Sequence, residues 1–209
     1  MSDVVVFGSD LSPFVRTARL AFVEKGVPLR LEAAALADPA YRARHPYARM
    51  PAMEHGKVRL FETAAIARYA DEAFDGPPLQ PADPAGRARM TQWISAYNAY
   101  MAVVFGQRLV VERFAPRIFD RPTNEAVIRD NLTDLDRALD VLNGALADQP
   151  YLAGPAASLA DLHVAPMLWY VGMTPEGQQR LPARPALARW LETVLARPSF
   201  AATVPKFGA

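Results

Sequence analysis

The chain has 209 residues, enough for one large domain or two modest ones. Hydrophobic residues make up 51% and charged residues 22% of the sequence, which is the composition of a folded protein and excludes disorder as its main state. A formal net charge of +1 provides no field to hold nucleic acid or an anionic membrane. There is no cysteine, so thiol chemistry would need a sulfur from another molecule.

No apolar run reaches the roughly 18 residues that a membrane-spanning helix needs. The first residues lead directly into a short strand-like run, without the basic segment of a secretory signal. We therefore expect the protein in the cytoplasm.

The first part of the chain alternates between strand and helix patterns. Val4–Phe7 is an apolar, mostly β-branched run, as in a central strand with both faces covered. Ser12 stands at a helix cap position and Pro13 at the first helical position, while Gly26 follows the helix end. The expected elements are a strand at 4–7, a helix at 13–25, a strand at 29–36, a connecting helix or loop, strands at 52–55 and 58–61, and a helix from 63 to about 74.

A proline-rich segment divides the sequence, with prolines at 77, 78, 81 and 84 that neither a helix interior nor a central strand accommodates. We expect a first domain over residues 1–76, a linker over 77–84 and a second domain over 85–209. Beyond the linker, apolar residues recur at helical spacing and no strand pattern remains. The expected helices cover 85 to about 113, 124–146, 158 to about 172, and 185–195. The fold class is therefore an α/β domain followed by an all-helical domain.

A serine hydroxyl lies where the first strand gives way to the first helix. Ser12 occupies the position at which open α/β sheets bind ligands, although a serine there also serves as a plain helix cap. Ser9 places a second hydroxyl in the same loop, and a shifted loop would present it instead.

Two further segments carry candidate binding groups. Pro51 stands at the entry of a predicted strand, either as an ordinary strand-initiating residue or as a cis proline that leaves the backbone of Met50 free to pair with a peptide-like ligand. Glu62 and Thr63 put a carboxylate and a hydroxyl at a helix start, where free N–H groups attract a ligand carboxylate. Alternatively, the two residues only stabilise the first turn of the helix and bind no ligand.

These three segments together resemble the cytosolic glutathione S-transferases, over nearly the whole chain. The resemblance rests on residues 12–26, the Met50–Pro51 step and residues 61–69. It implies a thioredoxin-like first domain (β-α-β-α-β-β-α) that binds glutathione and a helical second domain. Residues 151–154 and 158–161 resemble the helix-capping box of the family, which is a folding element. Within the family, the sequence resembles a bacterial-type member of the phi, tau and theta-like classes, which use a serine. Residues 92–94 (QWI) resemble the phi class.

The resemblance also implies residue roles. Ser12, in preference to Ser9, would donate its hydroxyl proton to the glutathione sulfur, and Met50, before a cis Pro51, would pair through its backbone with the cysteinyl unit. Glu62 and Thr63 would hold the γ-glutamyl ammonium and carboxylate.

Arg49 stands where the family often uses Lys or Gln toward the glycine carboxylate. The sequence departs from the family at Thr63, where Ser is more frequent, and at His45, where Asn is frequent.

The expected function is conjugation of the glutathione thiolate to small hydrophobic electrophiles in detoxification, with glutathione as cosubstrate and no metal. The alternatives are a glutathione-dependent peroxidase, dehalogenase or isomerase, or a noncatalytic binding module. The electrophile would bind in a cleft between the domains, near Leu11, Phe14 and Phe105. Trp93, Tyr97, Tyr100 and Val104 form a stripe at helical spacing, which more often belongs to a core or a subunit interface than to a pocket. The resemblance also implies a homodimer.

Overall fold

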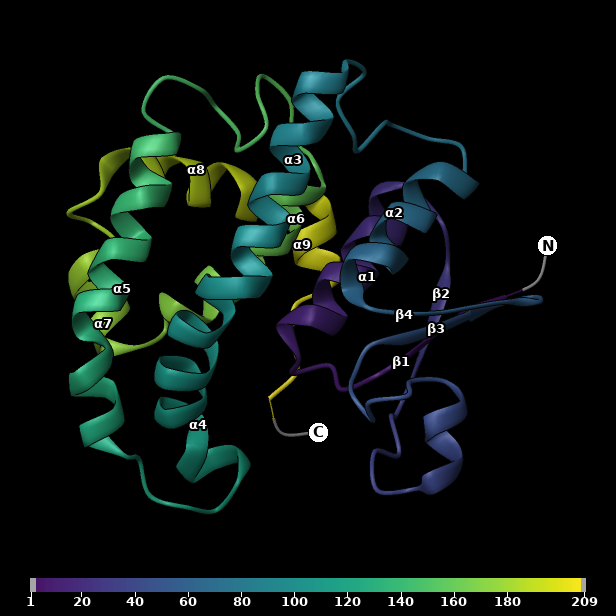
Figure 1. The fold of residues 1–209 in the computed structure, drawn as a ribbon, viewed down its shortest axis with the longest axis horizontal. Helices are drawn as coiled ribbons and strands as arrows, with labels where there is room; N and C mark the ends of the chain where they lie inside the picture. Colours follow the sequence, from purple (N-terminus) through teal and green to yellow (C-terminus); the bar gives the residue numbers. More distant parts are fainter. Residues whose placement is uncertain (1–2, 208–209) are drawn as a thin grey trace. The chain divides into compact units, whose positions relative to one another are not determined.

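The computed structural model describes residues 3–207, which form two compact units. One unit contains the residues up to Gln80 together with those from Ala196 onward, and the other is Pro81–Leu195 (Figure 1). The expected second domain continued to residue 209, whereas the structure places the segment after Leu195 with the first unit. The reason is that Arg197 pairs with Glu24 at 2.6 and 2.8 Å, and Phe200 is buried.

The first unit contains a four-stranded sheet in the order β2-β1-β3-β4. Strand β1 runs parallel to β2 and antiparallel to β3, which pairs antiparallel with β4. All four residues of β1 are buried, as its apolar run predicts. The strands are β1 (Val4–Phe7), β2 (Leu29–Glu32), β3 (Ala52–His55) and β4 (Val58–Phe61).

Strand β2 is shorter than predicted. It pairs with β1 alone, from Leu29 opposite Val4 to Glu32 opposite Phe7, so the ladder ends where β1 ends. The apolar residues that follow Glu32 therefore have no strand to pair with.

Helices cover one face of this sheet, and a short 3-10 helix contributes to the other. Helices α1 (Pro13–Glu24) and α2 (Thr63–Ala73) pack against each other and against the strands (Figure 1). On the opposite face Tyr41, from the 3-10 helix η1 (Pro39–Ala43), packs with Val5, Phe7 and Ala52. The C-terminal helix α9 (Pro198–Ala202) contacts α1.

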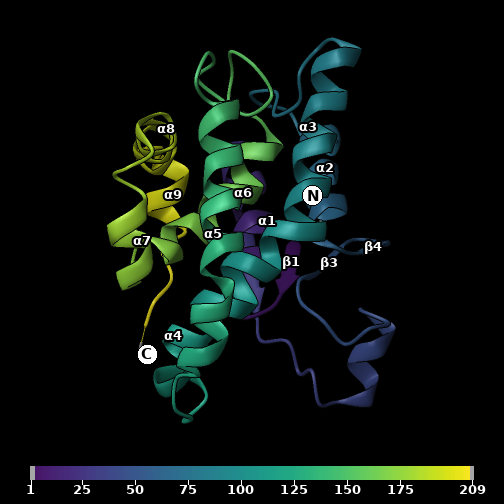
Figure 2. The same ribbon diagram turned by 60° about the vertical axis from the view of Figure 1, so that its left-hand side comes forward.

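The second unit is helical, as the sequence predicts. A long rod, expected as one α-helix, contains a π-helical segment whose Val104 carbonyl accepts the Asn131 side-chain amide at 2.9 Å. Helix α6 is almost entirely buried and contacts α3, η2 and α8 (Figure 2). The helices of this unit are α3 (Pro84–Ala96), the π-helix η2 (Tyr97–Val110), α4 (Val111–Ile118), α5 (Glu125–Ala145), α6 (Leu159–Val171), α7 (Pro175–Arg180) and α8 (Pro185–Leu195).

The predicted capping box is present at the start of α6. Ser158 caps the helix, and the Asp161 carboxylate accepts the N–H of Ser158 at 2.8 Å. The same buried carboxylate accepts the Leu152 N–H at 3.0 Å and the Trp190 indole N–H at 2.8 Å. It thus joins the loop before α6, the start of α6 and helix α8.

Candidate functional site

A cavity of about 340 Å³ opens in the first unit, where the ends of α1, β3 and α2 meet. Four segments of the chain supply its wall, and three of them contain the candidate binding residues that the sequence predicts. The lining residues are Ser12, Phe14, Leu36, His45, Arg49, Met50, Pro51, Glu62 and Thr63.

Ser12 is both a helix cap and a wall of the cavity. Its backbone is extended, and its hydroxyl oxygen accepts the Val15 N–H at 3.4 Å. Since a hydroxyl has one proton to donate and two lone pairs, this cap bond leaves the proton available to a ligand. Ser12 can therefore donate a hydrogen bond into the cavity while it caps α1.

Ser9 is placed differently. Its hydroxyl oxygen accepts the Leu11 N–H at 3.3 Å, and its main-chain N–H donates to the Met50 sulfur at 3.3 Å. Ser9 is not among the cavity-lining residues, whereas Ser12 is. The geometry thus favours Ser12 over Ser9 as the donor to a ligand in this cavity.

The loop before β3 forms a second wall. The Met50–Pro51 peptide bond is cis, and the β3 ladder begins at Ala52, so Met50 lies outside the ladder. The buried Tyr41 donates its hydroxyl to the Arg49 carbonyl at 3.0 Å and fixes the loop from behind. Burial raises the pKa of Tyr41, which keeps it a neutral donor, although Arg44 opposes this shift.

The start of α2 provides the charged end of the cavity. Glu62 has a left-handed backbone (φ 71°), an uncommon conformation for a residue other than glycine, and its side chain makes no cap hydrogen bond within the described chain. The first intrahelical bond runs from the Ile66 N–H to the Glu62 carbonyl, so the N–H groups of the preceding turn have no helical acceptor. Thr63 is buried, and its hydroxyl donates to the Phe14 carbonyl at 3.4 Å.

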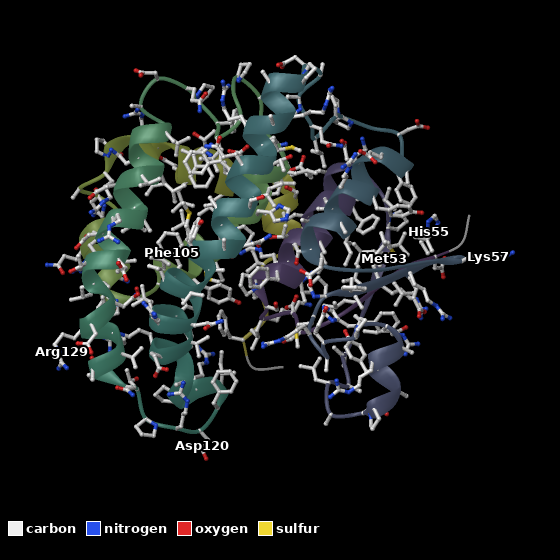
Figure 3. The ribbon with its side chains drawn as sticks, in the orientation of Figure 1. Met53, His55, Lys57, Phe105, Asp120 and Arg129 are labelled. Carbon is white, nitrogen blue, oxygen red and sulfur yellow. The ribbon has the colours of Figure 1, made fainter. Side chains whose placement is uncertain are left out.

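Sequence reasoning missed two residues of the cavity wall. His45 was noted for its departure from the family residue and given no role, although it is buried and faces Glu62, and Leu36 was read as part of a strand. Of the residues expected to contact the electrophile, Phe14 lines this cavity and Leu11 does not, and the electrophile pocket itself stays a prediction. Phe105 is fully buried in the helical unit (Figure 3), so it presents no surface to a ligand.

The cavity therefore combines a hydroxyl donor, a carboxylate, a helix N-terminus and a guanidinium with an apolar wall. A ligand that carries an ammonium, two carboxylates and a thiol, as glutathione does, finds an opposite charge or a donor for each group. In residues 3–207 no cluster of three or more His, Asp or Glu side chains could hold a metal ion. No helix in this range is long and apolar enough to cross a bilayer.

Comparison with known proteins agrees with this chemistry. The family model described as "Glutathione S-transferase, N-terminal domain" matches residues 6–78, and "Glutathione S-transferase, C-terminal domain" matches residues 100–198. The chain is 32% identical over 206 residues to glutathione S-transferase 4 of Zea mays, with 94% of this chain and 89% of that protein covered. The chain belongs to the glutathione S-transferase family.

Other members of the family give the same result. Glutathione S-transferase F11 of Arabidopsis thaliana is 30% identical over 209 residues, with 94% of this chain and 95% of that protein covered. The solved structure of glutathione S-transferase III in apo form has a TM-score of 0.90 and 29% identity, and the match covers 100% of this chain and 98% of that one.

The protein is thus an enzyme that uses glutathione as its cosubstrate and conjugates glutathione to electrophiles. The two named sequence relatives are plant enzymes, which gives no support to the expectation of a bacterial-style transferase.

Proposed function

We propose that this glutathione S-transferase activates glutathione through Ser12 and transfers the thiolate to small hydrophobic electrophiles. The observation that carries this proposal is the position of Ser12, which lines the cavity with a proton still to donate. The Ser12 hydroxyl donates a hydrogen bond to the sulfur, and the thiol proton leaves to solvent. The thiolate then forms a C–S bond to the electrophile while the leaving group, such as the halide of an aryl halide, departs.

The energetics are compatible with a serine that has no histidine partner. A thiol with a pKa near 8.5 is only a few per cent thiolate at neutral pH, and lowering that pKa by about two units takes roughly 2.7 kcal/mol. A hydrogen bond to a charged acceptor contributes about 1.5 to 3 kcal/mol, and a helix N-terminus such as that of α1 adds about 0.3 to 1 kcal/mol. Ser12 therefore never has to lose its own proton.

We assign the other cavity residues to the rest of the tripeptide. Glu62 would accept the γ-glutamyl ammonium, while Thr63 and the N-terminus of α2 would bind the γ-glutamyl carboxylate. Met50, held by cis Pro51, would pair with the cysteinyl backbone, and Arg49 would bind the glycine carboxylate. This assignment is supported by the joint lining of one cavity by all these residues.

The proposal also covers the class within the family, the oligomeric state and the cellular compartment. We place the protein in the phi class, which the F-type plant relative supports. We also propose a homodimer, supported by an open, mainly apolar groove of about 600 Å³ on the helical unit, whose lining includes the exposed Tyr100 and Val141. We propose a cytoplasmic location, because the cytosol keeps thiols reduced and the cosubstrate would therefore be available there.

A glutathione titration followed by difference absorbance near 240 nm tests the proposed function. The wild-type protein should bind glutathione and develop thiolate absorbance at neutral pH, and Ser12→Ala should bind with little change in affinity but without that absorbance. Equal thiolate absorbance in the two proteins would contradict the role of Ser12. Assays with an aryl halide, an organic hydroperoxide and a maleyl-type isomer then identify the reaction, and we expect turnover with the aryl halide.

A further inference from the structure

His45 is a buried polar residue in the wall of the cavity. Its side chain is 2% exposed, and its Nε2 atom lies 4.0 Å from Oε1 of Glu62. Within the described residues, the buried Nδ1 atom has no hydrogen-bond partner outside its own residue. Nε2 is therefore the ring nitrogen that faces a charged side chain of the cavity.

The structure packs the imidazole on its neighbours while it leaves the facing carboxylate exposed. The His45 ring packs on Phe61, with centroids 5.0 Å apart, and on Tyr47, at 6.3 Å. Its main-chain N–H donates to the Tyr41 carbonyl at 3.1 Å. The Glu62 side chain is 65% exposed. A buried, packed imidazole therefore faces an exposed carboxylate, and a hydrogen bond from the imidazole can orient the carboxylate.

The surroundings also select the tautomer and the charge of His45. With its proton on Nε2, the ring directs an N–H at Glu62, whereas a proton on Nδ1 would turn the Nε2 lone pair toward the carboxylate, which is unfavourable. Burial lowers the pKa of His45, and this outweighs the opposing effect of Glu62, while Arg49 adds to the lowering. A neutral imidazole orients the carboxylate without competing with a ligand ammonium for its charge.

We propose that His45 is a positioning residue that holds the Glu62 carboxylate in the orientation in which it accepts the γ-glutamyl ammonium. This inference rests on the glutathione site proposed above. A small rotation of Glu62 brings one carboxylate oxygen from 4.0 Å to hydrogen-bond distance of Nε2. The other oxygen then remains free for the ammonium, because a carboxylate accepts through both oxygens.

Two ligands and six variants test the proposal by calorimetric titration. The ligands are S-hexylglutathione and its analogue in which hydrogen replaces the glutamyl ammonium. His45→Phe keeps an aromatic ring without the N–H, and it should weaken S-hexylglutathione binding about tenfold, as expected for loss of one hydrogen bond to a charged group. Binding of the analogue should change little. The preference between ligands is a ratio within one protein, so it does not depend on the folded fraction.

Amide substitutions identify the atom that acts. The side-chain N–H of Gln reaches about the position of Nε2, and that of Asn reaches about the position of Nδ1. We expect His45→Gln to keep most of the preference for the ammonium ligand and His45→Asn to lose it. The opposite order would overturn the assignment to Nε2, and this comparison also stands if His45→Phe does not fold.

His55 provides the matched control. It ends β3 at the tip of the hairpin (Figure 3), its Nδ1 pairs with the Tyr69 hydroxyl at 2.8 Å, and it is absent from the cavity lining. His55→Phe should leave the ligand preference unchanged. In a Glu62→Gln background, His45→Phe should add almost no further loss, because the two residues act on one group.

The outcomes separate the inference from the site. If the wild-type protein binds neither ligand, both the glutathione site and this inference are overturned. A wild-type preference for the ammonium ligand that persists in His45→Phe would overturn the inference and leave the site intact.

Discussion

The Ser12 hydroxyl oxygen accepts the Val15 N–H over 3.4 Å at the first turn of α1. One side chain thus holds the helix start and, in the proposed function, donates its proton to the glutathione sulfur. Capping and catalysis make different demands, since a cap needs an acceptor and thiolate stabilisation needs a donor.

Substitutions at Ser12 should separate these two roles. Ser12→Ala loses the cap acceptor and the proton donor. It should therefore lower the free energy of unfolding by about 1 kcal/mol and also lower turnover. Ser12→Asp keeps an acceptor for the cap but cannot donate when ionised, so we expect near wild-type stability with loss of conjugation. Ser12→Thr keeps both functions and should be the most active of the three. Unfolding curves and conjugation rates measure the two effects, and an active Ser12→Asp protein would contradict the donor role.

Arg49→Ala should weaken glutathione binding through the glycine carboxylate alone. Exposed ion pairs contribute about 0.2 to 1 kcal/mol, so we expect a loss of about two- to fivefold. Glutathione with an amidated glycine carboxylate should bind equally to both proteins. Arg42→Ala is the control, because Arg42 is exposed in the same loop, donates to the Pro46 carbonyl at 3.4 Å and does not line the cavity. Equal loss for both ligands would exclude this role of Arg49.

The sequence predicted the local elements of the site well because each is determined within a few residues. The Ser12-Pro13 helix start, the cis Pro51 and the start of α2 at Thr63 all depend on short-range backbone preferences. The succession of strands and helices along the chain and the helical second unit follow from apolar periodicity.

The misplaced features depend on contacts between distant segments. Strand β2 ends at Glu32 because its partner β1 ends at Phe7, which no property of residues 33–36 indicates. The segment after Leu195 joins the first unit through Glu24, an acid 173 residues away. His45 faces Glu62 only after the sheet brings the loop and α2 together, so spacing along the chain could not reveal it.

Asp161→Asn should strongly destabilise the protein. The Asp161 carboxylate is fully buried and accepts from the N–H of Leu152 and Ser158, the Ser158 hydroxyl and the Trp190 indole. The amide replaces one carboxylate oxygen by an NH2 group, which cannot accept a hydrogen bond from the donors around it. Each buried donor left unpaired costs about 1 to 3 kcal/mol. We expect a loss of more than about 2 kcal/mol in denaturant unfolding. Asp130→Asn, at an exposed position of α5, should change the free energy of unfolding by less than about 0.5 kcal/mol. Equal losses of unfolding free energy in the two variants would contradict the prediction.

Tyr100→Asp should disrupt the proposed homodimer. Tyr100 is 72% exposed and lines the mainly apolar groove of the helical unit, where loss of the aromatic ring and burial of a carboxylate against a second copy would disfavour association. Sedimentation velocity should show a dimer for the wild type and a monomer for the variant. Asn98→Asp places the same charge at an exposed position of the same π-helix outside the groove, and it should remain dimeric. A dimeric Tyr100→Asp protein would place the interface elsewhere.

His163 should make the protein sensitive to acid. Its side chain is buried in α6, its Nδ1 lies 2.6 Å from the Leu159 carbonyl, and burial lowers its pKa from 6.5 to about 4. Because this shift is downward, the unfolded chain binds a proton below pH 6.5 while the folded protein does not until about pH 4. The free energy of unfolding should therefore fall by about 2 kcal/mol between pH 7 and pH 5 through this group alone.

The measurement for His163 is denaturant unfolding at a series of pH values. His163→Leu removes the titrating group, so its unfolding free energy should fall about 2 kcal/mol less than that of the wild type over the same range, whatever its stability at pH 7. Parallel pH profiles for the wild type and His163→Leu would show that His163 takes up its proton equally in the folded and unfolded states.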